Sequence, residues 1–295
     1  MSLSTTRWDG TLTALSSISH ASDTRGTITL LRRELIAQPD GRLVHVPIVS
    51  GNTLRGRLRR VGEELLRDVL AYEGKLQPAA AHALRGGGSL AKTSHEPLSG
   101  SRLARLRELV PQIGVFGAAG GGTIIDGALA VGKVVPHVLE TNHITGAGAS
   151  LSAFSATQIE AYTRQDDDGS HDFSVTPATP TAGLLFDTDG DPQPSTKAAP
   201  SQQMRFNIET FPVGTVFSTW LRLHRPSPLE LAFFLDVLAN FSSDARLGGR
   251  VAIGHGHVHV ALTPQPAPAV AELPDWRDVV AERSEEALEA LAGLT

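Results

Sequence analysis

Hydrophobic residues recur at two different periods along the chain, and each period predicts its own kind of element. Residues 11–20 (TLTALSSISH), 26–36 (GTITLLRRELI) and 42–49 (RLVHVPIV) alternate loosely between apolar and polar positions, which is typical of strands. Residues 39–41 (PDG) predict the turn between the last two. After residue 50 the apolar positions fall three or four residues apart and predict a helix with one buried face, at Leu54, Leu58, Val61, Leu65 and Val69.

The same alternation of strand and helix returns near the C-terminus. Residues 204–223 (MRFNIETFPVGTVFSTWLRL) predict one long strand or a pair of strands, and residues 247–262 (LGGRVAIGHGHVHVAL) predict a glycine-rich turn that enters another strand. Between them, Ser227 precedes a proline and Glu230 lies in the first turn of a capped helix. Residues 276–292 predict a peripheral, acidic helix.

Two segments interrupt this pattern. Residues 86–163 are rich in glycine around one predicted strand and are expected to form an inserted subdomain. Residues 164–203 are polar, acidic and rich in proline, a composition that predicts a flexible hairpin or loop. Residues 1–85 and 204–263 then give the order strand, helix, strand, helix, strand of an RRM-like (ferredoxin-like) α+β core. We expect a single domain over residues 1–295 with large insertions.

Charge is divided unevenly between the two ends of the chain. Residues 1–110 hold 16 Lys and Arg against 10 Asp and Glu, a charge of +6; residues 111–295 hold 10 against 21, a charge of −11, so the total is −5. The acidic total argues against a general nucleic-acid binder, but the basic half allows a localised anion site. The absence of cysteine excludes disulfides and thiolate metal sites. Without a long apolar run or a secretory-signal pattern, we expect a cytoplasmic protein with no membrane contact.

The predicted helix carries cations at the end where they are least favoured. Its first turns hold four arginines within six positions, Arg55, Arg57, Arg59 and Arg60. A helix N-terminus exposes unpaired N–H groups and a partial positive charge, so each cation there costs about 0.3–1 kcal/mol. A bound anion would reverse that sign. Ser50, Gly51 and Asn52 supply a flexible, hydrogen-bonding approach to such an anion, with Asn52 as the expected N-cap.

Intrahelical pairing accounts for only half of this cluster. Arg59 and Arg60 each have a glutamate four positions further on, at the spacing of a helical ion pair. Arg55 and Arg57 have no acidic residue three or four positions away on either side. The pattern favours phosphate binding by Arg55 and Arg57. A solvated basic face and pairing with another subunit are the alternatives.

Three stretches, in this order, resemble one known family: residues 47–59 (PIVSGNTLRGRLR), 206–217 (FNIETFPVGTVF) and 247–260 (LGGRVAIGHGHVHV). They are similar to the motif before the first helix, the segment after the thumb, and the C-terminal glycine-rich loop of the RAMP superfamily of CRISPR-associated proteins. Within it, the likeness is to the backbone subunit that polymerises along crRNA in effector complexes. Residues 17–35 (SISHASDTRGTITLLRREL) look most like the type IV backbone subunit of these antiviral defence systems.

The resemblance implies a fingers, palm and thumb arrangement, with residues 164–203 as the thumb, and helical oligomers in which the chain contacts crRNA, further copies of itself, other effector subunits and, through guide pairing, the target nucleic acid. Asn52, Arg55 and Arg57 would contact the guide backbone, and the glycine-rich loop would let RNA approach the main chain. The full expected RNA-binding set is Ser50, Gly51, Asn52, Arg55, Arg57, Arg59, Arg60, Arg246, Gly248, Gly249, Arg250, Gly254, His255 and Gly256.

The same resemblance bears on catalysis. Type III backbone subunits cleave target RNA with an aspartate in a loop before the first helix, whereas residues 25–35 (RGTITLLRREL) here have no aspartate, and Asp23 lies upstream. We therefore expect no catalytic residues, no target cleavage and no cofactor.

Two rival functions stay open. His255, His257 and His259 alternate, so in a strand they would share one face and could hold the metal of a hydrolase or RNase. They have no carboxylate close in sequence, and we expect no metal site. The glycine-rich residues 117–122 (GAAGGG) lack the surrounding pattern of a dinucleotide site. The other rival is a protein scaffold whose basic helix binds an acidic partner surface.

Overall fold

The computed structural model describes residues 4–88, 100–120, 123–165 and 203–294. Its central sheet is built from β1 (Thr6–Ala14), β8 (Leu129–Val131), β9 (Val135–Pro136), β12 (Val216–Leu223) and β13 (Val258–Gln265). The strand order is β13-β1-β12-β8, with β9 also paired to β12, and every pairing is antiparallel. The two ends of the chain therefore meet in one sheet, because β1 lies between two strands from the C-terminal third.

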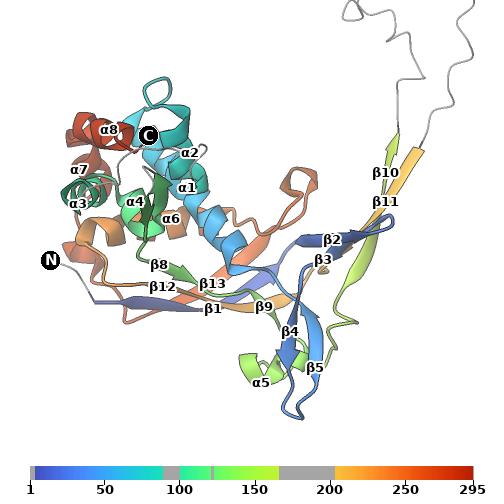
Figure 1. The fold of residues 1–295 in the computed structure, drawn as a ribbon. Helices are drawn as coiled ribbons and strands as arrows, with labels where there is room; N and C mark the ends of the chain where they lie inside the picture. Colours follow the sequence, from blue (N-terminus) through green and yellow to red (C-terminus); the bar gives the residue numbers. More distant parts are fainter. Residues whose placement is uncertain (1–3, 89–99, 121–122, 166–202, 295) are drawn as a thin grey trace, which may run out of the picture.

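Two helices cover one face of this sheet (Figure 1). These are α1 (Gly51–Leu70) and α6 (Pro228–Ser243). Trp8 of β1 packs edge-to-face on Phe234 of α6, with ring centroids 5.2 Å apart. Both side chains are fully buried, as are Leu12 of β1 and Leu221 of β12. Each such side chain contributes about 1.5–3 kcal/mol on burial, so this contact between sheet and helices is the main core.

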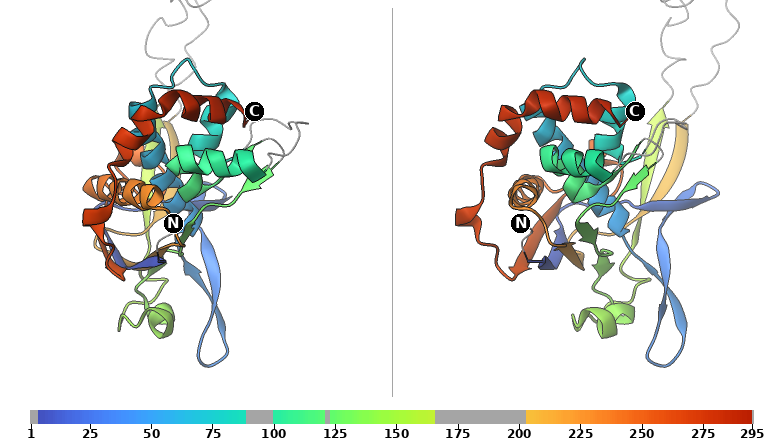
Figure 2. Two further views of the ribbon diagram at one scale, coloured as in Figure 1. Left: turned by 90° about the vertical axis from the view of Figure 1, so that its left-hand side faces the viewer. Right: turned by 60° about the vertical axis from the view of Figure 1, so that its left-hand side comes forward.

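Further helices extend the layer beyond α1 (Figure 2). They are α2 (Pro78–Gly86), α3 (Gly100–Leu109), α4 (Pro111–Phe116), α7 (Trp276–Glu282) and α8 (Ser284–Ala292), with the short β6 (Ala118–Gly120) and β7 (Thr123–Ile125) beside them. The expected single C-terminal helix is thus two helices, separated at Arg283. No helix in the described ranges is long and apolar enough to cross a bilayer.

A second sheet lies beside the first. It is built from β2 (Ala21–Arg25), β3 (Ile28–Leu31), β10 (Gln158–Gln165) and β11 (Gln203–Thr210). Its order is β10-β11-β3-β2, and β11 runs parallel to β3. The antiparallel β10–β11 pair forms an arm that stands apart from the helical layer (Figure 1). A hairpin of β4 (Arg33–Ala37) and β5 (Leu43–Pro47) and the short α5 (Asn142–Thr145) project from the other side.

Most expected elements are present, but several boundaries differ. The first strand begins and ends earlier than the apolar alternation indicates. The stretch 26–36 breaks at Arg32 into β3 and β4, which belong to different sheets. Residues 204–223 do form two strands, but β11 and β12 also pair in separate sheets, joined by a turn in which Gly214 has φ +84°. The alternation of apolar and polar residues identified these strands, but it could not predict which strands pair with one another.

The two main helices follow their sequence signals. The Ser227 hydroxyl accepts a hydrogen bond from the Glu230 N–H at 3.1 Å, and the Glu230 carboxylate accepts one from the Ser227 N–H at 2.7 Å, so the expected cap is confirmed. In α1, Leu54 and Leu58 are buried as expected, but the buried stripe continues through Leu66 and Leu70. Three of the valines and leucines expected on that stripe lie partly buried at its edge, Val61, Leu65 and Val69.

The predicted division into core, insertion and thumb stays a prediction. Residues 86–163 supply α3 and α4 to the helical layer and also β8 and β9 to the central sheet. The predicted thumb, residues 164–203, lies almost entirely outside the described residues. What the structure adds is its root, the β10–β11 pair.

Candidate nucleic-acid interface

Helix α1 begins without a side-chain cap. Ser50 occupies the N-cap position with an extended backbone, so the expectation that Asn52 caps the helix is wrong, and Asn52 is exposed in the first turn. The Ser50 hydroxyl bonds to Thr53 Oγ1 at 2.9 Å and to no N–H group of the helix. The first turn also holds no acidic side chain. This helix end therefore keeps the partial positive charge that attracts an anion.

Arg55 and Arg57 lie half-buried beside that end, and both bond to carbonyl oxygens. Arg55 Nη2 donates to the Phe116 carbonyl at 2.9 Å, and Arg57 Nη2 donates to the Gly248 carbonyl at 2.8 Å. Neither forms an ion pair with any residue that the structure describes. Burial lowers the pKa of both guanidinium groups, and for Arg57 the nearby Arg60 lowers it further. Each cation is thus oriented but not neutralised, and a guanidinium has five donors, most of them still available.

Arg59 has a structural role that the sequence did not reveal. Its side chain is buried and donates to the carbonyls of Ala83, Phe116 and Gly117, at the C-terminal ends of α2 and α4. The guanidinium also lies over the Phe116 ring, 5.6 Å from its centroid. Burial, and then the nearby Arg55, lowers the pKa of Arg59 to about 10. The expectation that Arg59 contacts RNA is corrected, because internal carbonyls surround it.

The expected ion pairs along α1 are also wrong. Glu63 is buried and pairs with Arg85 and Arg67, and it accepts a hydrogen bond from the Tyr72 hydroxyl. Glu64 pairs with Arg85 at 3.7 Å. Because of these tertiary contacts, Glu63 does not pair with Arg59 and Glu64 does not pair with Arg60. Arg60 is left exposed, with no ion pair among the described residues.

The glycine-rich loop divides into packed and open positions. A Cβ on Gly248 would lie 2.4 Å from the Ser19 carbonyl oxygen, and one on Gly256 would lie 2.2 Å from the Leu247 carbonyl oxygen. Internal packing is therefore sufficient reason for these two glycines. A Cβ on Gly249 would meet only one atom, at 3.8 Å, and Gly254 faces open space. A ligand could approach the main chain at Gly249 and Gly254.

The arginines of this loop differ in the same way. Arg246 pairs with the Asp244 carboxylate at 2.8 Å, so its charge is already balanced. Arg250 is exposed, has a left-handed backbone with φ +56°, and holds its guanidinium 5.4 Å from the centroid of the Phe206 ring. Phe206 in turn stacks on Tyr162 of β10, with ring centroids 5.7 Å apart. The loop and the root of the arm thus share one stack of side chains.

His255 is buried inside this junction. Its Nδ1 lies 2.9 Å from the Ser17 hydroxyl and its Nε2 lies 2.6 Å from the Tyr162 hydroxyl. Tyr162 also donates to the Glu160 carboxylate at 2.8 Å. The expectation that the His255 side chain reaches RNA is corrected, since it joins β10 to the glycine-rich loop. Local sequence held no signal for this network, because His255 lies more than ninety positions from both Ser17 and Tyr162.

The carboxylate of this network is strongly held in its charged form. Although burial raises it, hydrogen bonds from Thr210, Tyr162, Ser17 and Gln158 lower the pKa of Glu160 to about 2. Burial, and then the bond to Glu160, raises the pKa of Tyr162 to about 12. Across the neutral range the pair is therefore a fixed carboxylate with a fixed hydroxyl donor, which suits an anchor between strands.

The three alternating histidines do not converge. His255 turns into the core, His257 lies 4.0 Å from Asp244, and His259 is exposed on β13. Gly254, before His255, and Gly256, between His255 and His257, adopt positive φ values, so this stretch is not the regular strand that a shared face requires. Within the described ranges no group of three or more His, Cys, Asp or Glu is placed to hold a metal ion.

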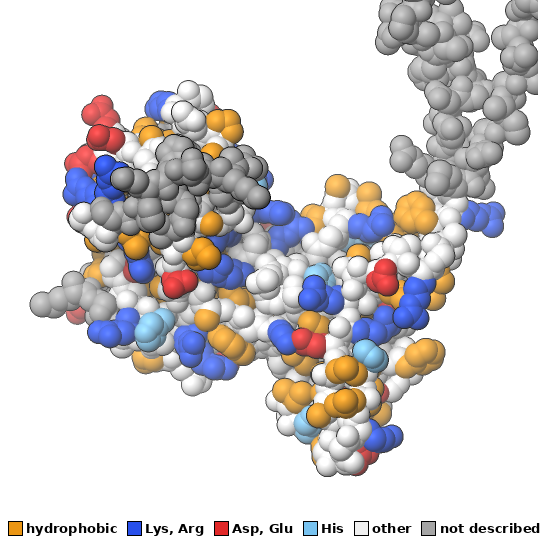
Figure 3. Space-filling model, in the orientation of Figure 1, with side chains coloured by type: hydrophobic (Ala, Val, Ile, Leu, Met, Phe, Trp, Pro, Cys, Tyr) orange, Lys and Arg blue, Asp and Glu red, His pale blue; other side chains and the backbone are white. Residues whose placement is uncertain are grey.

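Basic side chains gather around the site as a whole. Figure 3 shows Lys and Arg on the narrow part of the molecule between the helical layer and the second sheet. The start of α1, the glycine-rich loop and the root of the arm all border this region, since Arg57 bonds to Gly248 and Arg250 lies on Phe206. The geometry fits an extended anionic ligand that passes across the start of α1.

The comparison with known proteins gives the class of this molecule. One chain of a solved structure, titled as a Type IV-B CRISPR complex, is 33% identical in sequence, and the match covers 93% of this chain and 99% of that one with a TM-score of 0.60. No protein-family model matches the chain, and no curated protein matches it. The chain is a CRISPR-associated subunit. It belongs to the same family as that chain of the Type IV-B complex.

His20 provides a test of the electrostatics at the start of α1. Its Nε2 accepts a hydrogen bond from the Ser50 N–H at 3.2 Å, and burial, and then Arg32, lowers the pKa of the ring. Because the folded pKa lies below the unfolded value of about 6.5, the stabilisation is complete above about pH 6.5 and is lost as the pH falls through the folded pKa. We expect the free energy of unfolding to fall on acidification, with a smaller decrease in His20→Gln.

Urea unfolding between pH 4.5 and 8 measures this difference. The matched control is His45→Gln, since His45 is exposed on β5. It should leave the decrease in the free energy of unfolding between pH 6.5 and 4.5 as it is in the original chain. An identical decrease in His20→Gln and the original chain would contradict the expectation.

Proposed function

We propose that this chain is the crRNA-binding backbone subunit of a type IV effector complex, which holds the guide at the start of α1. One observation carries the proposal: two half-buried guanidinium groups, Arg55 and Arg57, stand at a helix N-terminus whose first turn has no acidic residue, and within the described part of the chain they bond only to carbonyl oxygens. Cations in that position are unfavourable until an anion joins them. The family relationship to a chain of a CRISPR complex supports a guide RNA as that anion.

The contacts available are of the sequence-independent kind. Guanidinium groups, N–H groups of a helix end and glycine main chain all recognise phosphate rather than base edges. A backbone subunit has to bind any guide sequence, so this chemistry fits the role. The residues that we assign to the guide are Ser50, Asn52, Arg55, Arg57, Arg60, Gly249, Arg250 and Gly254.

We also propose that the central sheet is an RRM-like core. The chain passes through β1, α1, β8, β12, α6 and β13, and the strands lie in the order β13-β1-β12-β8. That is the connectivity of a ferredoxin-like split βαβ unit, with both helices on one face. The RAMP assignment rests on this core together with the three motifs of the sequence.

Assembly of several copies along the guide belongs to the same proposal. The β10–β11 arm stands in the place of a thumb root and apart from the helical layer. In a head-to-tail array such an arm reaches the adjacent copy, and the repeating copies then hold the guide for pairing with a target. A protein scaffold that binds an acidic partner is the competing function, and co-purifying nucleic acid separates the two.

The double variant Arg55→Ala/Arg57→Ala tests the phosphate site. Charge-assisted hydrogen bonds contribute about 1.5–3 kcal/mol each, so we expect affinity for single-stranded RNA to fall at least about tenfold. The slope of log K against log salt should flatten by roughly 1.4, the value for two phosphate contacts on a single strand. Fluorescence anisotropy across a salt series measures both quantities, and electron microscopy measures filament formation.

The control removes two arginines elsewhere, as Arg42→Ala/Arg277→Ala. Arg42 pairs with Asp40 and Arg277 pairs with Asp236, both on the surface. This control should keep the affinity and the slope of the original chain. Equal affinities of all three proteins at physiological salt would sink the proposal.

Gly56 gives a second test, in which stability and binding move in opposite directions. It lies inside α1 between the two arginines, where a Cβ would meet nothing within 4 Å. Replacing a glycine in a helix interior by alanine stabilises by about 0.5–1 kcal/mol. If RNA approaches the helix here, Gly56→Ala raises the free energy of unfolding and lowers RNA affinity. Thermal unfolding and anisotropy measure the two effects.

Gly62→Ala is the control on the same helix. Its Cβ would lie 2.5 Å from Gln112 Oε1 and 3.0 Å from the Phe233 ring, so it should destabilise the fold. A Gly56→Ala protein that is more stable and binds RNA as tightly as the original chain would place the RNA elsewhere.

We further propose that the subunit is not a nuclease. Asp23 lies on β2, whose residues are all exposed, and its carboxylate accepts a hydrogen bond from the Thr24 N–H at 2.8 Å. The assembled complex, incubated with complementary RNA and Mg²⁺, should leave the target intact on a denaturing gel. Regularly spaced cuts that disappear in Asp23→Ala would reverse this conclusion.

A further inference from the structure

Helices α1 and α6 cover only one face of the central sheet, and the opposite face is left open (Figure 1). Along β1, β12 and β13 the side chains that point away from the helices include hydroxyls, histidine and arginine. On these three strands Asp9 is the one carboxylate of that face, and Arg7 already pairs with it at 2.7 Å. Arg222 is exposed and has no ion pair among the described residues. The face therefore keeps a positive charge without a partner of its own.

An aromatic platform stands on this face. The Arg7 guanidinium lies over the Trp220 ring, 4.8 Å from its centroid, and Arg222 lies 5.9 Å from the same centroid. Asp9 accepts from Arg7 Nε at 2.7 and 2.9 Å and from Nη2 at 2.8 Å. Bonds in the guanidinium plane fix Arg7 and leave free the flat face of the group that is turned away from Trp220. Nucleic-acid bases stack on such indole and guanidinium surfaces.

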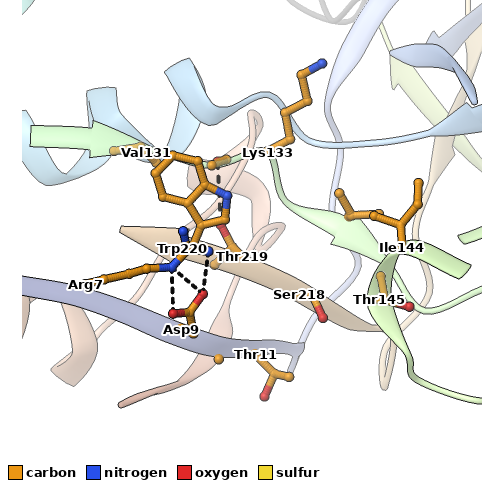
Figure 4. Close-up of a pocket in the computed structure, with 13 residues that line it drawn as sticks. Arg7, Asp9, Thr11, Val131, Lys133, Ile144, Thr145, Ser218, Thr219 and Trp220 are labelled. Atoms are coloured by element: carbon orange, nitrogen blue, oxygen red, sulfur yellow. Dashed lines mark hydrogen bonds and ion pairs between the residues drawn. The ribbon is translucent and has the colours of Figure 1, made fainter. Parts of the chain in front are cut away.

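A cavity of about 660 Å³ lies beside the platform. Figure 4 shows Trp220, Arg7 and Asp9 on one side of it and Ile144 and Thr145 on the other. Hydroxyl groups of Thr11 and Ser218 also line it, and they can bond to base edges or to sugar. The volume falls in the range of small-ligand sites, about 300–1,000 Å³. The lining joins these hydroxyls and charges to the apolar side chains of Val131, Val135 and Ile144, a mixture that suits a base, which has flat faces and polar edges.

The cavity adjoins the site at α1 through a single loop residue. A Cβ on Gly132 would lie 2.6 Å from Trp220 Nε1, so the indole packs directly on this glycine. On the other side, a Cβ on Gly51 would lie 2.8 Å from the Gly132 carbonyl oxygen. Gly132 thus separates Trp220 from the first residue of α1. A polynucleotide that crosses the start of α1 can continue past this loop onto the open face.

We propose that the open face is a second binding site for single-stranded nucleic acid, in which one unpaired base stacks on the platform of Trp220 and Arg7 and a phosphate pairs with Arg222. The identity of the ligand rests on the proposed function, but the residues are separate from those at α1. The guide contact there recognises phosphate, whereas this site recognises the flat surface of a base. RNA and DNA share that chemistry, so the site accepts the single strand of either.

The experiment compares Trp220→Ala with Trp220→Phe, which keeps a stacking ring. Labelled single-stranded RNA and DNA of the same sequence are the probes, and anisotropy is measured across a salt series. Stacking of one base is worth about 1–3 kcal/mol, so Trp220→Ala should bind roughly 5- to 150-fold more weakly with an unchanged salt slope. Trp220→Phe should stay within about threefold of the original chain. The probe, RNA or DNA, that binds Trp220→Ala more weakly than the original chain identifies the kind of strand that the site takes.

Two further readouts do not depend on the alanine variant folding. Trp8 and Trp276 are buried, so quenching of tryptophan emission by bound RNA should disappear in Trp220→Phe. Photo-crosslinking of RNA that contains 4-thiouridine should label peptides from β1 or β12. Loss of quenching and these crosslinks support the site.

The result that overturns it is equally specific. If Arg55→Ala/Arg57→Ala weakens RNA binding while Trp220→Ala, folded, binds as the original chain does and no crosslink maps to β1 or β12, the second site is wrong and the proposed function stands. If neither variant weakens binding, both fail. A Trp220→Ala protein that assembles less but binds RNA normally would make this face a protein contact and reject the proposal.

Discussion

The buried guanidinium of Arg59 fixes the arrangement on which the rest of this structure depends. A buried cation is costly unless its donors are satisfied, and here they are satisfied by carbonyls of Ala83, Phe116 and Gly117. The carbonyl-rich C-terminal ends of α2 and α4 also suit a positive charge electrostatically. One side chain therefore binds three helices together. The same Phe116 carbonyl accepts a hydrogen bond from Arg55, so the packing of the helical layer also sets the direction of the first arginine that we assign to the guide.

From that constraint follows a division of labour among neighbouring arginines. Arg59 turns inward and becomes part of the fold, Arg55 and Arg57 lie at the boundary, and Arg60 faces solvent. The hydrogen bonds to carbonyl oxygens restrict the side chains of Arg55 and Arg57, so these side chains would lose less conformational entropy when a ligand binds. Their positive charge stays uncompensated. Carboxylate partners would have oriented them equally well but would have competed with phosphate. A preorganised, uncompensated pair is what separates a binding surface from a merely basic one.

The sequence predicted the α+β class, both principal helices, the Ser227 cap and the lack of an intrahelical acidic partner for Arg55 and Arg57. These are local properties, carried by period, capping residues and the absence of acids three or four positions away. It could not predict that Arg59 is internal, because the partners of Arg59 lie far along the chain. The same reason explains His255: its neighbours Ser17 and Tyr162 are remote in sequence. The family resemblance was confirmed at the level of a CRISPR-associated subunit. It rested on the order of three motifs along the chain and did not require any single tertiary contact to be predicted.

The anchoring of the arm at His255 has a mechanical consequence. Strand β10 is tied to the loop after α6 by the hydroxyl of Tyr162, and that loop is tied to α1 by Arg57. Tilting the arm would strain these two part-buried hydrogen bonds. These bonds therefore fix the orientation of the base of the arm relative to the central sheet. In any array of identical copies, an arm of fixed orientation sets the rise and rotation from one copy to the next. The contacts at the base of the arm would then determine the helical pitch of the array.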